Sequence, residues 1–434
     1  MIKSLFKQLI NRKKSNGWII LELLLVFCVL WYLVDYFFVI TYNHMLPSYM
    51  STDHTLQVNI TQYPPDHPEY KEEENEPEQI EANYNRILNH IRSYPGVTHL
   101  SVSFKRSTPG SDSYTRTIFG ILNDTTKTCL VRFITIDPSS DYFGVFGFSE
   151  KNGKKNVSVQ DYEWEKPNAI VINSLTASQL FPAGNAIGQT ILETSQPDRM
   201  YEIVGIVDES KRFASERPEA LCFIPNRLEA SFISSTPKAE ISIRITPSIR
   251  DNIFFPAFIQ DMENNLCIGN FYFLSAGSYD NKVDQLNEIS GHNIANRTRL
   301  YLMIFLLINV ILCVIGTFWY RVNVRRKEIG LRMALGSSRK NIKSSLITEG
   351  ILLLSLITLP ALLLEWQFVY AGLIETYGKG DYSEMILLPD KTFLRFVITN
   401  ILTWLLMAIV ITTAIWLPAR RASLLAPAEA LHYE

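Results

Sequence analysis

Four long runs of apolar residues constrain this chain more than any other feature of its sequence. They cover Trp18–Ile40, Leu300–Tyr320, Ile351–Ile374 and Phe396–Leu417. Each is about 20 residues long, the length that an α-helix needs to cross a hydrocarbon core roughly 30 Å thick. Within them only Glu22, Asp35 and Glu365 are charged. The sequence therefore predicts an α-helical membrane protein with four transmembrane helices, at 18–40, 300–320, 351–374 and 396–417.

The distribution of lysine and arginine predicts how these helices are oriented. Basic residues cluster in 1–17, 321–349 and 418–434, whereas 375–395 is mildly acidic. Loops on the cytoplasmic side carry an excess of Lys and Arg. We therefore expect a multi-pass protein of the bacterial inner membrane with both termini and 321–349 in the cytoplasm. The segments 41–299 and 375–395 are then outside.

The N-terminus raises the question of a signal peptide, because basic residues precede the first apolar run. That run is too long for a signal peptide and lacks a small-x-small cleavage site, so we interpret it as an uncleaved anchor. Residues 1–17 have apolar positions at helical spacing beside lysines and arginines, which predicts an amphipathic helix on the anionic inner leaflet. A binding site for a partner is the less favoured alternative.

The outer segment 41–299 predicts a large α+β domain. A strand (Thr55–Ile60), a helix (Glu78–Ser93) and a strand (Val97–Phe104) recur near its other end as Ile241–Thr246, Asn252–Leu266 and Phe271–Gly277. An acidic, proline-rich connector, Pro64–Pro77, separates the first strand from its helix. Two such βαβ units bracketing a strand-rich piece at about 137–236 indicate a split ferredoxin-like lobe with a second lobe inserted into it.

The stretch Tyr279–Leu300 leads from this domain into the second apolar run. Its pattern predicts a helix despite Gly291, without an obvious break before the membrane. Such a helix would form a stiff lever between the outer domain and the membrane. A polar linker is the alternative.

Motifs for enzymatic or metal chemistry are absent from the sequence. It has no GxxxxGK[ST] phosphate loop, no GxGxxG after a strand, no HExxH and no GxSxG. The cysteines of the outer segment allow at most one disulfide, and no His/Cys spacing suggests a metal. We therefore expect a non-catalytic chain with no catalytic residue, no metal, no cofactor and no nucleic-acid partner.

The segment Arg325–Gly350 (RRKEIGLRMALGSSRKNIKSSLITEG) is the most informative part of the chain. Ile329 and Met333 predict a short apolar face on a helix at the membrane surface. Gly336 permits a turn, after which a second helix rises into the bilayer. Composition alone would equally fit a basic loop that satisfies the positive-inside rule.

The identities of the residues in Arg325–Gly350 favour a functional role for this segment over a basic loop. The segment resembles the signature of FtsX-like and MacB-like ABC transporter permeases, with matches at Lys327, Glu328, Ile329, Gly330, Arg332, Ala334, Gly336 and Glu349. Two further segments resemble the same family: Ile170–Phe213 is similar to its outer domain and Leu417–Glu434 to its C-terminal tail. The resemblance implies a MacB-like core domain at 41–299 and an FtsX-like permease domain at about 300–427.

The resemblance also implies a mechanism called mechanotransmission, in which ATP hydrolysis on the cytoplasmic side moves the outer domain. Since the chain has no phosphate loop, an ABC ATPase subunit must be supplied in trans. The residues expected to couple to it are Lys327, Glu328, Ile329, Gly330, Arg332, Met333 and Gly336. A homodimer, or a heterodimer with a related permease, is expected, and a periplasmic adaptor or outer-membrane channel is a further candidate partner.

Two classes of output remain open at this point. The favoured one is export or extraction of a hydrophobic or peptidic substrate, and the alternative is an FtsX-like signalling adaptor that activates a periplasmic hydrolase. A membrane-tethered receptor without an ATPase would leave the Lys327–Gly336 signature without a reason. For Glu365, the sequence does not decide between a functional role and packing at a dimer interface.

Overall fold

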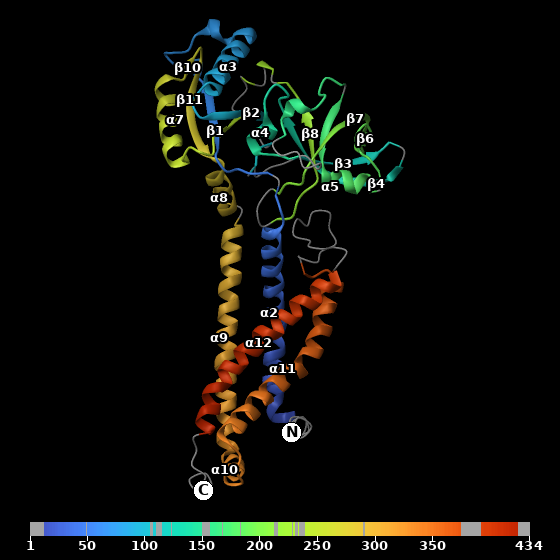
Figure 1. Cartoon of the computed structure of the whole chain (residues 1–434), viewed down its shortest axis with the longest axis vertical. Coiled ribbons are helices and arrows are strands. Elements are labelled where there is room, and N and C mark those ends of the chain that lie inside the picture. Colours follow the sequence, from blue (N-terminus) through green and yellow to red (C-terminus); the bar gives the residue numbers. More distant parts are fainter. Residues whose placement is uncertain are drawn as a thin grey trace. The chain divides into compact units, whose positions relative to one another are not determined.

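The computed structural model describes residues 13–48, 50–104, 107–109, 115–122, 124–149, 157–166, 168–182, 184–211, 216–227, 229–230, 233, 239–289, 291–374 and 392–423. The chain divides into two compact units (Figure 1). The helical unit comprises Met1–Asn43 and Asn293–Glu434, and the α/β domain comprises His44–His292. The predicted N-terminal amphipathic helix, most of the loop 375–395 and the end of the tail 418–434 lie outside the described residues.

The α/β domain contains a four-stranded antiparallel lobe. Its elements are β1 (Thr55–Gln62), α3 (Pro77–Arg92), β2 (Val97–Phe104), β9 (Ala239–Ile245), α7 (Asp251–Asn265) and β11 (Phe271–Ser278). The strands lie in the order β11-β1-β9-β2, which is the order of a ferredoxin-like sheet. The 3₁₀ helix η1 (Glu72–Asn75) precedes α3, and the short strand β10 (Cys267–Ile268) borders β11.

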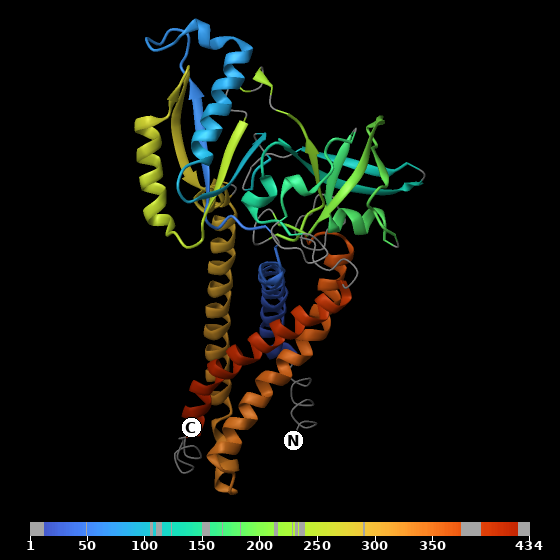
Figure 2. The same ribbon diagram turned by 45° about the horizontal axis from the view of Figure 1, so that its top comes forward.

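Buried apolar side chains alternate with more exposed ones along the strands of this lobe, and the buried ones hold it together. Leu56, Val58 and Ile60 of β1 point to one face and are buried against α3 and α7, which Figure 2 shows beside the sheet. Burying each such side chain stabilises the fold by about 1.5–3 kcal/mol. Helix α3 begins with Pro77 in its first turn, where a missing N–H costs nothing.

A second, strand-rich lobe is inserted between β2 and β9. It contains β3 (Thr115–Ile121), β4 (Asp124–Ile136), β5 (Ala169–Asn173), β6 (Thr190–Glu193), β7 (Gln196–Val207) and β8 (Leu221–Pro225), with α4 (Tyr142–Phe146), η2 (Val159–Asp161) and α5 (Ser174–Leu180). The strands of both lobes form one 11-stranded sheet, and among the described residues one pair, Ser103 with Ile136, joins β2 to β4. β3 pairs with β6, and β4 pairs with β8, so β3 and β4 belong to the insertion. The insertion therefore begins at the end of β2, whereas the sequence predicted a start near residue 137.

Helix α4 packs over the polar face of the first sheet. Asp141 caps it, accepting a hydrogen bond from Gly144 N and contacting His99 Nδ1 at 2.7 Å. Burial alone would raise the pKa of Asp141, but hydrogen bonds from His99, Ser158 and the backbone of Val159 and Gly144 outweigh it and lower the pKa. The ionised carboxylate therefore stabilises this junction.

The domain ends in α8 (Tyr279–Ile289), whose first turn is anchored in the domain. Tyr279 is fully buried and shares a 2.6 Å hydrogen bond with Ser242 of β9. Lys282 donates to Thr108 at 3.0 Å and lies 3.6 Å from Glu240. These contacts hold α8 to both lobes of the domain.

The predicted continuous helix from Tyr279 into the membrane is wrong. The structure has two helices, α8 and α9 (His292–Val324), and Gly291 lies between them at a φ of +72°. This left-handed conformation interrupts a right-handed helix and favours glycine. The break coincides with the boundary between the two units.

The helical unit consists of α2 (Lys13–Met45), α9, α10 (Arg326–Ala334), α11 (Arg339–Tyr370) and α12 (Thr392–Ala422). Four of these helices are long and apolar enough to cross a membrane: α2, α9, α11 and α12. The predicted fold class, four transmembrane helices with a large α+β domain, is confirmed. Helix α11 ends at Tyr370, earlier than the predicted span 351–374, and Gly372 follows at a φ of +70°.

Close packing at one glycine joins α11 to α12. A Cβ at Gly350 would lie 2.3 Å from Ile415 Cδ1 and 3.0 Å from Ile411 Cγ2. The absence of a side chain at Gly350 therefore lets the two helices approach closely. On the other side of the unit, Tyr36 of α2 donates to Asn296 of α9 at 2.6 Å.

Candidate functional site

The short helix α10 carries most of the residues that the sequence singled out. Arg325 forms a turn between α9 and α10, and Gly336 closes α10 at a φ of +94°. Ser337 N donates to Arg332 O, which satisfies one of the carbonyls left open at the end of the helix. Ser338 then caps α11 by accepting from Asn341 N. Glycine and serine are the residue types suited to these two positions, the end of α10 and the start of α11.

One face of α10 is turned into the helical bundle. Ile329 is only 7% exposed and Gly330 is buried, and both contribute to the packed interior of the unit. Met333 is half-buried and packs against the same cluster, to which Ile342 and Leu346 of α11 belong. The sequence places Ile329 and Met333 on a short apolar face expected to couple to the ATPase. In the structure the bundle covers Ile329 and part of Met333.

The opposite face of α10 is exposed and also contains apolar residues. Leu331 is 51% exposed and Leu335 is 78% exposed, and they lie four residues apart on one side of the helix. Lys327 and Arg332 are exposed beside them. The four-residue spacing of the two leucines indicates an apolar face, but Ile329 and Met333 have the same spacing. Spacing alone could not decide which pair faces the bundle.

Arg332 also forms an ion pair within α10. Its Nη2 lies 2.6 Å from Glu328 Oε1, one helical turn earlier. Both side chains are more than one-third exposed, so the pair stabilises the helix by only about 0.3–0.5 kcal/mol. Its effect is to hold the Arg332 guanidinium along the helix axis.

A buried ionic network connects α10 to its neighbours. Glu349 of α11 is 2% exposed and accepts hydrogen bonds from Arg321 Nη1 at 2.7 Å and Arg325 Nη1 at 2.9 Å. Arg321 lies in the last turn of α9, and Arg325 is the turn that starts α10. One carboxylate therefore fixes the positions of three helices relative to one another. Removing it would leave two largely buried cations without their carboxylate.

Three other charged side chains are buried among the described residues of the helical unit. Arg395 of α12 forms a two-fold hydrogen bond with Asp35 of α2, and both side chains are buried. Glu365 of α11 is fully buried, and neither of its oxygens has a hydrogen-bond partner among the described residues. Its nearest polar neighbours are Cys28 and Asn400.

The described residues contain no group of three or more His, Cys, Asp or Glu side chains placed to hold a metal ion. The five cysteines are free, including the three of the α/β domain. The site around α10 therefore consists of an amphipathic helix, a glycine turn and an ionic network, an arrangement suited to contact and force transfer.

Two models of known families match the chain. Residues 39–254 match the model of the MacB-like periplasmic core domain. Residues 300–424 match the model of the FtsX-like permease C-terminal domain. Neither of these two models describes an ATPase domain.

Curated relatives show the same relationship at low identity. The chain is 24% identical over 305 residues to the macrolide export ATP-binding/permease protein MacB of Salmonella typhimurium, covering 68% of this chain and 43% of that protein. It is 23% identical over 307 residues to the MacB protein of Escherichia coli strain K12, with the same coverage. The chain thus spans less than half the length of the curated relatives it matches.

Among solved structures, the periplasmic region of MacB from Actinobacillus actinomycetemcomitans aligns over 55% of this chain and 94% of that chain, with 12% identity and a TM-score of 0.31. The extracellular domain of the ABC-type transporter YknZ from Gram-positive bacteria covers 50% of this chain and all of its own, with 13% identity and a TM-score of 0.28. The two family models together match most of the α/β domain and nearly all of α9 to α12. The chain belongs to the family of membrane-embedded ABC transporter permeases that combine a MacB-like periplasmic core domain with an FtsX-like permease domain.

Proposed function

We propose that this chain is a permease subunit that couples ATP hydrolysis on a separate ABC ATPase to motion of its MacB-like domain. The observation that carries the proposal is the two-sided character of α10. One side, through Ile329, is part of the bundle, and the other presents Leu331 and Leu335 with basic residues beside them. A helix of this kind can take up a displacement on its outer side and pass it to the helices behind it.

The docking surface in this proposal differs from the one that the sequence suggested. We define it as Lys327, Leu331, Arg332 and Leu335, the exposed side of α10. Exposed leucines that become buried in a partner's pocket are a common source of binding energy, and the rim charges beside them add specificity. Ile329, Gly330 and Met333 then connect α10 to the bundle, Gly336 allows the turn into α11, and Glu328 orients Arg332.

The remaining parts of the proposal follow from the family. The α10 side is placed in the cytoplasm with both termini, and the α/β domain in the periplasm, in agreement with the positive-inside pattern. The chain acts as a homodimer or with a related permease, since ABC permeases work in pairs. The curated relatives are named for macrolide export, and for this chain we propose the broader class of export or extraction of a hydrophobic or peptidic molecule. A periplasmic adaptor or outer-membrane channel would complete the path.

The test compares three variants in mild detergent. Leu331→Ala with Leu335→Ala should leave the melting temperature unchanged, because both side chains are exposed. Retention of the co-expressed ATPase should fall about 10-fold or more, as expected when buried anchor residues at an interface are truncated. Ile253→Ala is the matched control, since Ile253 of the α/β domain is 62% exposed and should affect neither property.

Ile329→Ala distinguishes the two faces of α10. This substitution should lower the thermal stability of the helical unit, because truncating a buried isoleucine costs about 2–5 kcal/mol. Unchanged retention of the ATPase in the double leucine variant would contradict the docking surface. If the chain regulates a hydrolase instead of exporting a substrate, the double leucine variant should lose activation of the hydrolase. No substrate should then accumulate in cells that carry it.

A further inference from the structure

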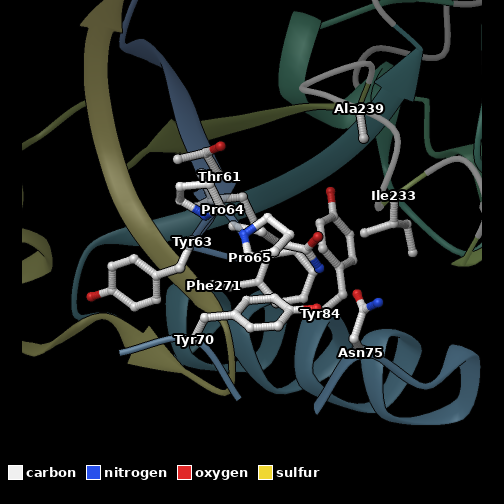
Figure 3. A pocket seen from close by; sticks show the side chains of 12 residues that line it. Thr61, Tyr63, Pro64, Pro65, Tyr70, Asn75, Tyr84, Ile233, Ala239 and Phe271 are labelled. Atoms are coloured by element: carbon white, nitrogen blue, oxygen red, sulfur yellow. The ribbon is translucent and has the colours of Figure 1, made fainter. Parts of the chain in front are cut away.

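The ferredoxin-like lobe contains a pocket of about 450 Å³ that the coupling mechanism does not use. Figure 3 shows it framed by Pro64, Pro65 and Tyr70 on one side and by Asn75 and Tyr84 on the other. Its volume lies within the range of sites that bind a small molecule or a few peptide residues. Its walls come from β1, β11, α3, η1 and the acidic connector.

Two polar groups at this pocket lack partners. Tyr84 is 4% exposed, and its hydroxyl has no hydrogen-bond partner among the described residues. The side-chain nitrogen of Gln62 is equally buried and equally unpartnered within the described chain. Buried polar groups in native proteins are nearly always paired, and an unpaired one calls for an explanation. Both groups can donate to an oxygen of a bound ligand.

The end of β1 forms one wall of the pocket. β9 pairs with β1 from Thr55 to Val58, and β11 follows the other side of β1 as far as Gln62. Ile60, Thr61 and Gln62 line the pocket beyond the last of the pairs with β9. Pairing with β11 therefore holds this wall in place.

The rim of the pocket is strongly acidic. The connector Tyr63–Glu76 contains six carboxylates and one lysine. The exposed carboxylates are Asp66, Glu69, Glu72, Glu73 and Glu76, and Glu74 is half-buried and accepts a hydrogen bond from Asn83. Asn75, which lines the pocket, lies within this run. A positively charged ligand is therefore attracted to the pocket.

The position of the pocket in the lobe limits what can reach it. The chain enters the lobe at the start of β1 and leaves it at the end of β11, and these two ends are paired with each other at Leu56 and Ser278. The pocket lies at the opposite end of the same strands, near Gln62 and Phe271. The first and last of the eight residues of β1 are roughly 24 Å apart. The pocket therefore faces away from the connections to the helical unit.

We propose that this pocket binds an extended, basic segment of a partner protein in the same compartment. The backbone carbonyls of the segment accept hydrogen bonds from Tyr84 and Gln62, and an apolar side chain packs between the tyrosine and proline side chains. Its arginines or lysines pair with the carboxylates of the connector. A partner protein is favoured over a transported molecule, because the site lies at the end of the strands opposite to the one where the chain enters and leaves the lobe.

The experiment uses the full chain in nanodiscs of phosphatidylcholine, a lipid without net charge. The probe is a fluorescein-labelled hexapeptide amide of alternating arginine and leucine, and the matched peptide has glutamate in place of arginine. Fluorescence anisotropy should show saturable binding of the basic peptide, weakening as salt is raised. The acidic peptide and empty nanodiscs should show none. ATP is absent, so a failure here leaves the coupling proposal untouched.

Tyr84→Phe gives the sharpest result. Loss of one ligand hydrogen bond should weaken peptide binding roughly 3- to 10-fold. The melting temperature of the variant should stay the same or rise, because the hydroxyl has no partner when the ligand is absent. Tyr94→Phe, at a tyrosine of the same lobe that does not line the pocket, is the control and should not affect binding. A hydroxyl with only a structural role would give the reverse pattern, with lower stability and unchanged binding.

The rim is tested separately. Glu72→Gln with Glu73→Gln changes two exposed side chains and should leave folding intact while reducing both the affinity and its dependence on salt. Equal binding of the acidic and basic peptides, unchanged affinity in Tyr84→Phe, or no binding at a peptide concentration of about 100 μM would each overturn the proposal. In a further measurement, ATP and the ATPase are added to the peptide-bound protein. Release of the peptide on this addition would indicate that the pocket binds a transported molecule and would overturn the assignment to a partner protein.

Discussion

Glu349 provides the most direct test of how the helices around α10 are held. Glu349→Gln keeps the size of the side chain but removes the charge that Arg321 and Arg325 share. Both arginine side chains are nearly buried, at 10% and 12% exposed. Removing one partner of a buried ion pair costs about 3–5 kcal/mol, because the remaining charge is left uncompensated.

Arg321→Gln should cost less than Glu349→Gln. The carboxylate still has Arg325 at 2.9 Å, so the variant loses one charge-assisted hydrogen bond, worth about 1.5–3 kcal/mol. The triple variant, in which Arg321, Arg325 and Glu349 all become glutamine, should recover part of the loss, because no uncompensated charge remains. The three effects are therefore expected to be strongly non-additive.

Thermal unfolding in mild detergent, followed by tryptophan fluorescence, measures these differences. Six of the seven tryptophans lie in the helical unit, so the signal reports on that unit. At roughly 2–4 °C per kcal/mol for a unit of this size, Glu349→Gln should lower its melting temperature by about 6–20 °C. An Arg321→Gln variant as unstable as Glu349→Gln, or a triple variant more unstable than either, would refute the shared-carboxylate argument.

Two further predictions concern packing and pH. Gly350→Ala should destabilise the helical unit by about 1–3 kcal/mol, because the new methyl group would lie 2.3 Å from Ile415, whereas Gly316→Ala, with no atom within 4 Å, should be neutral or slightly stabilising in the same melting assay. The lowered pKa of Asp141 means that its stabilising contribution is complete above the unfolded-state value of about 3.9 and is lost as the pH falls through the folded value. Asp141→Asn should therefore lower the melting temperature of the α/β domain at pH 7 and flatten its decline below pH 4, and an equally steep acid decline in the variant would assign that decline to other groups.

The ferredoxin-like lobe could be predicted from the sequence because its signals are local. Helix α3 was expected at Glu78–Ser93 and is observed at Pro77–Arg92, since a proline start and an apolar stripe define it within one segment. The strand expected at Val97–Phe104 has those bounds in the structure. Its alternating burial follows from residues that are neighbours in the chain.

The inserted lobe was harder to delimit because its boundary depends on strand pairing. β4 is a long strand whose pairing with β8 joins segments about 90 residues apart, and nothing within Asp124–Ile136 indicates that partner. The same limit applies to α10. Ile329 and Leu331 are both apolar, and only the presence of α11 and α12 behind the helix determines which of them is buried.

The connection from Tyr279 to the helical unit differs between the sequence prediction and the structure, and this difference changes the proposed mechanism. A rigid rod from Tyr279 into the membrane would carry bending as well as axial force, and a flexible insert after Asn296 would test it. In the structure Asn296 lies inside α9, where it accepts a hydrogen bond from Tyr36, so that insert would disrupt the helical unit itself. Helix α8 is fixed to the α/β domain by Tyr279, and α9 is fixed to α2 by Asn296. The chain crosses between the units at two places, within α2 at Asn43–His44 and after Gly291. Force that α8 and α9 carry must pass through Gly291, so in the proposed mechanism the stiffness at this position, and not that of the helix that follows, limits what this connection transmits.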